Sequence, residues 1–307
     1  MESLVFKKKL RRDATIQSLL LLMLAVGGMF GAMPAVWIFD FFGLDTEFQE
    51  FIVSSYFNVI YELIFLGVAY LIYKYRFADF FARPKTTVKF SVYTVLGVLG
   101  AASVGLLIFF VYNLLFSVGG MEVLAPEFTE GITNPTYLVL INLYICLFGP
   151  ILEEIVFRGV ILGTLKKYGN LFAILFSSIL FAMFHMNAGQ LPVPLLTGLI
   201  LGYATIKSGS IIPAIIAHIV NNSFNTLAVE LFDIPVVSAV GNIVYFVCIA
   251  AFVMMLVKLV KDARTWRGYN DLMSTGKMMG ISALSFGFIL YFVFYASALY
   301  LFSFAAV

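Results

Sequence analysis

Charged side chains are scarce in this chain. They make up 12% of its 307 residues, whereas hydrophobic residues make up 62% and the mean hydropathy is +1.01. A soluble domain carries about 25% charged and about 45–50% apolar residues. No polar tract of domain size separates the apolar runs, which argues against a soluble partner domain. We therefore predict one membrane domain over residues 1–307, an all-α polytopic helix bundle.

Cysteine is scarce as well. The two cysteines, Cys146 and Cys248, lie in apolar runs about a hundred residues apart, which fits neither a disulfide framework nor a paired-cysteine metal site. The chain also lacks the His-Glu-x-x-His pattern of zinc peptidases and the Gly-x-Ser-x-Gly turn of serine hydrolases. Ser177 and Ser178 are therefore weak candidates for a nucleophile, although they lie near His185 in the sequence.

Long apolar runs are abundant, and nine of them approach the ~20 residues needed to cross a ~30 Å hydrocarbon core. They lie at about residues 15–40, 52–74, 88–116, 136–162, 171–187, 191–207, 210–229, 237–258 and 279–305. We expect nine transmembrane spans, with eight as the alternative. The first run follows Lys-Lys-Lys-Leu-Arg-Arg as in a signal peptide, but Pro34 and the continued apolar character to Phe42 favour a retained helix.

The loops between these runs alternate in charge. If the N terminus is cytoplasmic, every Lys and Arg except Arg158 lies before, in or beside a cytoplasmic loop. The opposite loops carry acidic residues alone: Asp40, Asp45, Glu47, Glu50, Glu122, Glu127, Glu130, Glu230 and Asp233. The positive-inside rule then predicts a multi-pass integral membrane protein with a cytoplasmic N terminus. A basic surface for nucleic acid or anionic lipid is the weaker interpretation, so we expect no nucleic-acid partner; the oligomeric state is not indicated.

A group of five ionisable residues lies inside three of the apolar runs: Glu153, Glu154, Arg158, His185 and His218. Such a residue costs at least ~2.5–3.5 kcal/mol in hydrocarbon and by default indicates a functional site. At ~1.5 Å per helical residue, Glu153, His185 and His218 lie roughly 15, 21 and 12 Å from the cytoplasmic ends of their spans. They share one layer, so we expect an active site that opens toward the cytoplasmic side.

Helical spacing separates the two glutamates. Glu154 and Arg158 are i,i+4 neighbours and are expected to pair, whereas Glu153 points about 100° away on the same helix. An unpaired, desolvated carboxylate is suited to act as a general base. The alternative is a buried ion triad of both glutamates with Arg158 that only locks helices together.

The second histidine has a helical partner of its own. His218 and Asn222 are also i,i+4 neighbours and could jointly donate hydrogen bonds to an oxyanion; the alternative is that they satisfy backbone groups across a helix interface. Asn221 lies off their stripe. Phe181, one turn before His185, is expected to shield that imidazole from lipid, and Phe184 to serve in ordinary packing.

The three patterns together resemble the CAAX protease and bacteriocin-processing family of intramembrane proteases, which includes the type II CAAX prenyl endopeptidases. They are Glu-Glu-x-x-x-Arg from Glu153, Phe-x-x-x-His from Phe181 and His-x-x-x-Asn from His218. The resemblance covers roughly residues 136–226, which we expect to form the catalytic core helices. It implies an intramembrane endopeptidase for a membrane-presented or lipidated peptide.

The resemblance also implies roles for the motif residues. In such enzymes the residues matching Glu153 and His185 activate water, and those matching His218 and Asn222 stabilise the oxyanion. Glu154 and Arg158 would support Glu153.

A metal is left open. Glu153, His185 and His218 would also make an open Zn²⁺ site of one carboxylate and two imidazoles. We favour water activation without an obligatory metal, with Zn²⁺ as a possible cofactor.

Two other functions are also left open. One is a proton- or ion-coupled transporter, in which Glu62 joins a relay; otherwise Glu62 is expected to bond Asn58, its i,i+4 neighbour. The other is a non-catalytic membrane scaffold or immunity protein. A prenylated C terminus and a bacterial peptide are both compatible substrates.

Overall fold

A computed structural model describes residues 2–31, 33–43, 46–52, 57–124, 132–231, 235–266 and 273–306. Its helices, with π-helices labelled η, and its strands are α1 (Glu2–Phe30), α2 (Met33–Phe41), α3 (Thr46–Phe51), α4 (Phe57–Tyr73), α5 (Phe77–Phe80), α6 (Val88–Val118), β1 (Met121–Val123), α7 (Pro135–Leu143), η2 (Tyr144–Phe148), α8 (Gly149–Glu154), η3 (Ile155–Leu162), α9 (Gly163–Leu165), α10 (Asn170–Phe184), α11 (Pro192–Ser208), α12 (Ile212–Leu231), α13 (Pro235–Thr265), α14 (Thr275–Ala283), α15 (Phe286–Phe302) and β2 (Phe304–Ala306).

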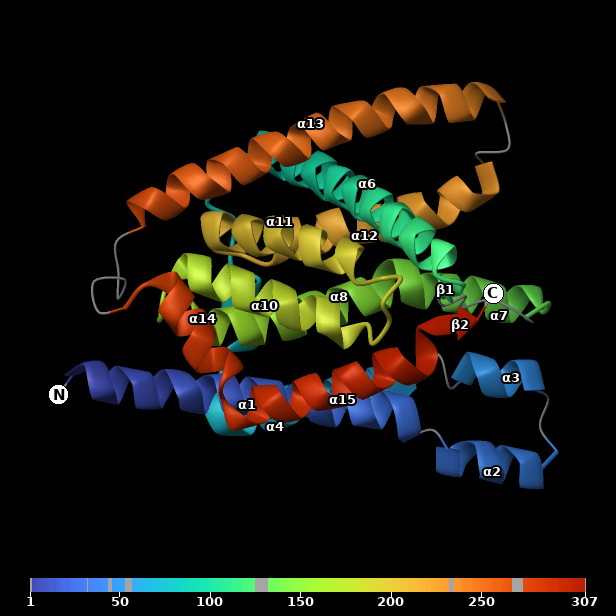
Figure 1. Cartoon of the computed structure of the whole chain (residues 1–307), viewed down its shortest axis with the longest axis horizontal. Helices are drawn as coiled ribbons and strands as arrows, with labels where there is room; N and C mark the ends of the chain where they lie inside the picture. Colours follow the sequence, from blue (N-terminus) through green and yellow to red (C-terminus); the bar gives the residue numbers. More distant parts are fainter. Residues whose placement is uncertain are drawn as a thin grey trace.

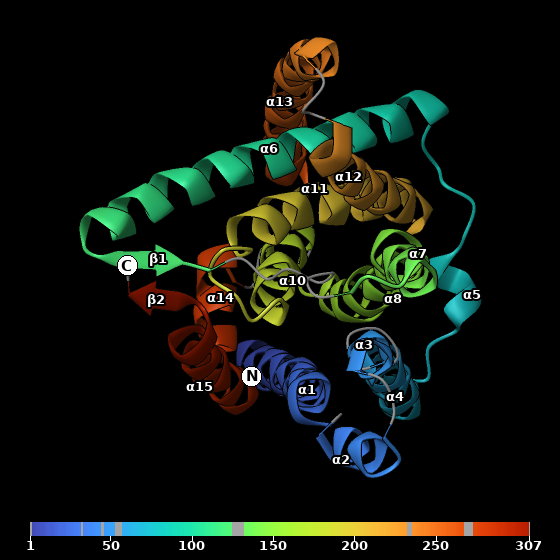
Figure 2. The ribbon, with the colours of Figure 1, turned by 90° about the vertical axis from the view of Figure 1, so that its right-hand side faces the viewer.

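Most of the long helices run close to the long axis of the molecule, and the two chain ends lie at opposite ends of it (Figure 1). Seen end-on, α10 lies in the middle, with α1, α8, α11 and α14 around it (Figure 2). Helices α6 and α13 cover one side of this centre, and α1, α4 and α15 cover the other. The predicted all-α class is confirmed. The described residues add one short antiparallel pair, in which Val123 of β1 lies opposite Phe304 of β2.

Fewer helices are long enough to cross a membrane than the nine spans that the sequence predicted. In the described parts of the chain, four helical runs are long and apolar enough to cross a membrane: Ser3–Phe41, Val88–Val118, Pro135–Leu165 and Ile243–Thr265. Helices α14 and α15, bent by 70°, make a fifth if they count as one span. Each predicted span overlaps helical residues, but α4 and α10 have only 17 and 15 residues. The structure supports an integral membrane protein, and the count of nine is not confirmed.

The bundle has two distinct ends. At the end with the N terminus, the loop before α6 is bonded to the last residue of α11, where Lys85 N donates to Ser208 O at 2.8 Å. Nearby, Lys167 forms a 2.6 Å ion pair with buried Asp13. At the other end, the β1–β2 pair joins the loop after α10, where Ala188 N donates to Ser303 Oγ at 3.0 Å. We call these the basic end and the sheet end.

Close helix packing depends on glycine at the contact between α6 and α13. A Cβ on Gly100 would collide with the Cys248 carbonyl group of α13. Between helices in a membrane, small residues let backbones approach because apolar burial gives no advantage over lipid. Gly67, on α4, has nothing within 4 Å of the corresponding position.

We expect Gly100→Ala to lower the melting temperature in detergent, because the two backbones must separate. Gly67→Ala is the matched control and is expected to leave it unchanged or raise it, since Ala is better than Gly in a helix by about 1 kcal/mol. Thermal unfolding of both variants checks this. Equal effects would contradict the close contact.

Candidate active site

The helical run from Pro135 to Leu165 alternates between α and π geometry. Asn134 caps it by accepting a hydrogen bond from Thr136 N, with Pro135 at the first helical position. Two π-helical stretches, η2 and η3, flank the short α8 that carries Glu153 and Glu154. π-Helical turns are rare and occur frequently at functional sites.

Glu154 forms the ion pair that its spacing predicted. Arg158 Nη1 donates to Glu154 Oε1 at 2.8 Å, and both side chains are almost fully buried. The same Oε1 lies 3.0 Å from His218 Nδ1, so α12 is joined to α8 through this carboxylate. The expected Glu154–Arg158 pair is confirmed, and His218 extends it into a chain of three charged or polar groups.

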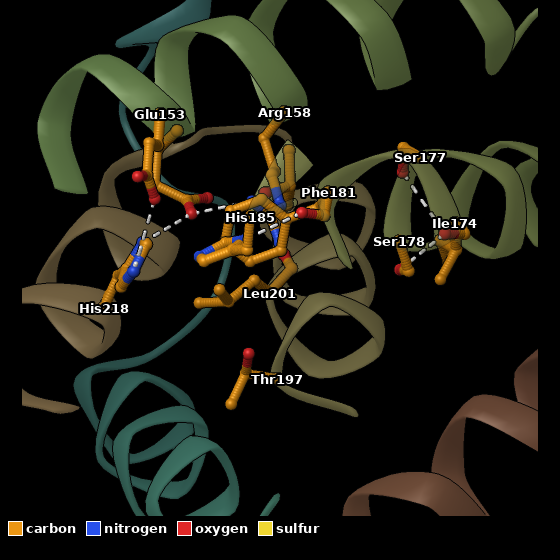
Figure 3. A network of polar contacts seen from close by, with 12 residues as sticks. Glu153, Arg158, Ile174, Ser177, Ser178, Phe181, His185, Thr197, Leu201 and His218 are labelled. Atoms are coloured by element: carbon orange, nitrogen blue, oxygen red, sulfur yellow. Dashed lines mark hydrogen bonds and ion pairs between the residues drawn. The ribbon is translucent and has the colours of Figure 1, made fainter. Parts of the chain in front are cut away.

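Glu153 lies outside this pair, as its helical phase predicted. Its Oε2 is 3.7 Å from His218 Nε2, and 18% of its side chain is exposed (Figure 3). Among the described residues, no ion pair joins Glu153 to Arg158. The triad of both glutamates with Arg158 is therefore not formed in these parts of the chain.

His185 ends α10 and has one ring nitrogen engaged. Its Nδ1 lies 2.9 Å from the Phe181 carbonyl oxygen, which can only accept, so Nδ1 carries the proton and Nε2 is left as an acceptor. The next residue, Met186, has φ 51°, a left-handed conformation that is unfavourable for a residue other than glycine. This turn stops the helix at His185.

Phe181 connects the two imidazoles to Arg158. Its ring meets His185 edge-on at 5.1 Å and His218 edge-on at 5.8 Å between centroids. The Arg158 guanidinium lies 4.3 Å from the same ring centroid, within cation–π range. Phe184 does more than the packing we expected, because it contacts His185 and lines the cavity described next.

A cavity of about 580 Å³ lies against these side chains. Its wall includes Glu153, His185, His218 and Asn222. The structure thus brings together all four residues predicted to be catalytic, while Glu154 and Arg158 lie buried behind them. Phe181 also reaches the wall.

The cavity extends toward the sheet end, because its wall also includes residues from the end of α1, the start of α11 and the loop after α10. Two expectations stay predictions: that the site opens toward the cytoplasmic side, and that Glu153, His185 and His218 share one layer of the bilayer.

Asn222 makes the kind of contact that the alternative interpretation predicted, a hydrogen bond to a backbone group of another helix. Asn222 Nδ2 donates to the Ile145 carbonyl in η2 at 3.0 Å, and Asn221 Nδ2 donates to Asn222 Oδ1 at 3.2 Å. Asn221 is 5% exposed, lines the cavity, and its Oδ1 has no hydrogen-bond partner among the described atoms. The helical phase of Asn221 led us to expect it outside the site. The three amides at 221, 222 and 225 were the feature of the sequence that could have indicated it.

The possible zinc ligands do not lie close enough together to form a metal centre. In the described ranges, no three His, Cys, Asp or Glu side chains are grouped so that they could hold an ion. His185 Nδ1 and His218 Nδ1 are engaged by Phe181 and Glu154, so only the two Nε2 atoms would be free to act as ligands.

Ser177 and Ser178 both bond the Ile174 carbonyl and point away from the glutamates (Figure 3). They are therefore not placed for nucleophilic attack at this site.

Glu62 of α4 lies behind the site. It is 2% exposed, and it is close enough to Glu153 to interact electrostatically. Its Oε2 makes no hydrogen bond in the described structure.

Fold and site together define a class: a helical membrane protein with buried carboxylates and imidazoles around an internal cavity. Residues 135–224 match the family model described as type II CAAX prenyl endopeptidase, Rce1-like. The family resemblance predicted from the three motifs is thereby confirmed over the segment that carries them, and it indicates a membrane protease. No curated protein and no solved structure matches the chain.

We expect Arg158→Met to lower the free energy of unfolding by about 3–5 kcal/mol, because it leaves the buried Glu154 carboxylate without a cation. Lys207→Met is the control. It breaks the Lys207–Asp262 pair, whose side chains are 43% and 26% exposed, and is expected to cost less than about 1 kcal/mol. Denaturant unfolding in mixed micelles measures both. Similar losses for the two variants would contradict the role of Arg158.

Proposed function

We propose that this protein is an intramembrane endopeptidase that hydrolyses a peptide bond in a membrane-presented or lipidated peptide. One observation carries the proposal. A cavity inside the bundle has Glu153, His185 and His218 in its wall, within the segment that matches a CAAX endopeptidase family.

Glu153 is the general base of the proposed reaction. It is partly exposed to the cavity and is not neutralised by Arg158, so its carboxylate can accept a proton from water. His185 Nε2, which is left as an acceptor, can accept a hydrogen bond from the same water and so help to hold it. The water oxygen then bonds the carbonyl carbon of the substrate, and the proton passes to Glu153.

His218 and Asn222 stabilise the oxyanion formed in this step. Glu154 accepts from His218 Nδ1 and holds the ring so that Nε2 faces Glu153 at the cavity, where the imidazolium form would donate to the oxyanion. Asn222 uses one amide hydrogen for Ile145 and has a second for the oxyanion. The carbon–nitrogen bond then breaks, and the proton held by Glu153 passes to the leaving amine. The products are a carboxylic acid and an amine; when the acid ionises, the second water proton passes to the amine, which gives a carboxylate and an ammonium group.

Glu154, Arg158 and Phe181 act through their neighbours. Arg158 compensates the Glu154 charge, and Glu154 orients the His218 ring. Phe181 packs against both imidazoles. This arrangement holds the reacting groups in place, which is the main requirement for efficient water attack.

The alternative functions have less support. Glu62 beside Glu153 is compatible with a proton relay in a transporter. The family match, however, favours a peptidase and does not favour a relay or a scaffold.

Cleavage of a lipidated reporter peptide in proteoliposomes tests the proposal. Glu153→Ala is expected to lower turnover at least about 100-fold, the lower range for loss of a general base. Glu122→Ala removes an exposed carboxylate at the sheet end and serves as the control. Equal turnover by wild type and Glu153→Ala would contradict the assignment, and loss of wild-type turnover on thorough chelation would contradict water activation without a metal.

A further inference from the structure

The loop after α10 carries part of the site and contains an unfavourable backbone conformation. It begins at His185, and Met186, Gly189 and Gln190 also line the cavity. Met186 has φ 51°, and a left-handed residue with a side chain costs about 1–2 kcal/mol. Such a conformation persists where the surrounding structure holds it in place. The contacts that hold this loop therefore also hold the position of the His185 imidazole.

Both backbone polar groups of Ala188, three residues after His185, are bonded to side chains of other elements. Ala188 N donates to Ser303 Oγ at 3.0 Å, and Tyr112 Oη donates to the Ala188 carbonyl oxygen. The same oxygen accepts from Leu191 N at 3.3 Å within the loop. We call Ala188 with the Tyr112 and Ser303 side chains the Ala188 clamp.

The two side chains of the clamp have fixed positions of their own. Ser303 lies between α15 and β2, is fully buried, and accepts from Leu124 N through its carbonyl oxygen at 2.9 Å. On α6, Asn113 follows Tyr112 and accepts from Val123 N of β1 at 2.9 Å. Figure 2 shows β1 between the end of α6 and β2, which it contacts on either side. The strand pair thus joins the two sources of the clamp.

The clamp connects the motif segment to parts of the chain without a motif. His185 and Ala188 lie within residues 135–224, the segment that matches the family model, whereas Tyr112 precedes it and Ser303 follows it. Helix α6 and the junction of α15 with β2 therefore contact the backbone of a loop that lines the cavity.

We propose that Tyr112 and Ser303 are positioning residues, which hold the loop after α10 through Ala188 so that His185 Nε2 stays directed at the attacking water. This inference rests on the proposed peptidase activity and adds two residues to its machinery. Loss of either hydroxyl leaves an Ala188 backbone group with one partner fewer, and the loop can relax away from the strained Met186. A displacement of about 1 Å at a reacting group can cost about 100-fold in rate.

Hydrogen–deuterium exchange of the protein in lipid nanodiscs tests the clamp without reference to activity. We expect Ser303→Ala to raise the exchange rate of the Ala188 amide at least about tenfold, because this amide loses its acceptor. Ser297→Ala is the matched control. It removes an exposed hydroxyl of α15 that bonds the Val293 carbonyl of the same helix, and it is expected to leave the loop unchanged. An unchanged rate in Ser303→Ala would overturn the inference.

Turnover of the lipidated reporter by folded protein tests the consequence for the reaction. Ser303→Ala and Tyr112→Phe are each expected to lower kcat at least about tenfold and to leave KM within about threefold, because the clamp places a group that acts in the transition state. Tyr300→Phe removes an exposed hydroxyl of α15 and is expected to keep the wild-type kcat. The double variant is expected to lose less than the product of the two single losses, because both side chains act on one peptide unit.

Three results separate the two proposals. Faster exchange with kcat within about twofold of wild type in both variants would overturn the positioning role and leave the peptidase assignment intact. A rise in KM with unchanged kcat would also overturn it, since it would indicate a loss of substrate binding alone. Wild-type turnover no higher than that of Glu153→Ala would overturn the peptidase assignment instead.

Discussion

The buried pair of Glu154 and Arg158 is the interaction on which the rest of the site depends. Neither charge could remain inside an apolar bundle alone, and each is compensated by the other at 2.8 Å. Glu154 also accepts a hydrogen bond from His218 of α12, and the Arg158 guanidinium lies over the ring of Phe181 of α10. One ion pair thus connects the three helices that carry the three motifs, and it leaves Glu153 facing the cavity.

Much of this was predictable because helix geometry is regular. The i,i+4 spacing predicted the Glu154–Arg158 pair, and the different helical phase of Glu153 predicted that it lies outside that pair. The apolar runs predicted an all-α membrane protein. What could not be predicted is which residues outside the three motifs line the cavity. Side chains of α1, α6 and α11 join the motif residues in its wall, and no pattern in the sequence indicates them. Asn221 was missed because a helical stripe does not show which neighbouring helix covers a side chain.

The two ends of the bundle differ in charge and in their distance from the cavity. Lys85 and Lys167 lie at the basic end, and the pattern of Lys and Arg along the sequence predicts, by the positive-inside rule, that such an end is cytoplasmic. The cavity extends toward the sheet end. Loop charge reports how helices insert, whereas the position of a cavity follows from how short helices pack between long ones. These are separate physical constraints. The asparagines of α12 in the cavity wall are placed by helix packing.

The central claim is that two adjacent glutamates have different tasks, one chemical and one structural. Turnover and thermal unfolding of Glu153→Gln and Glu154→Gln, measured on the same preparations, test it most directly. We predict that Glu153→Gln loses turnover while its melting temperature stays within about 2 °C of wild type, and that Glu154→Gln unfolds at least about 5 °C lower because buried Arg158 loses its counter-charge. A stable, inactive Glu154→Gln beside an active Glu153→Gln would contradict the account.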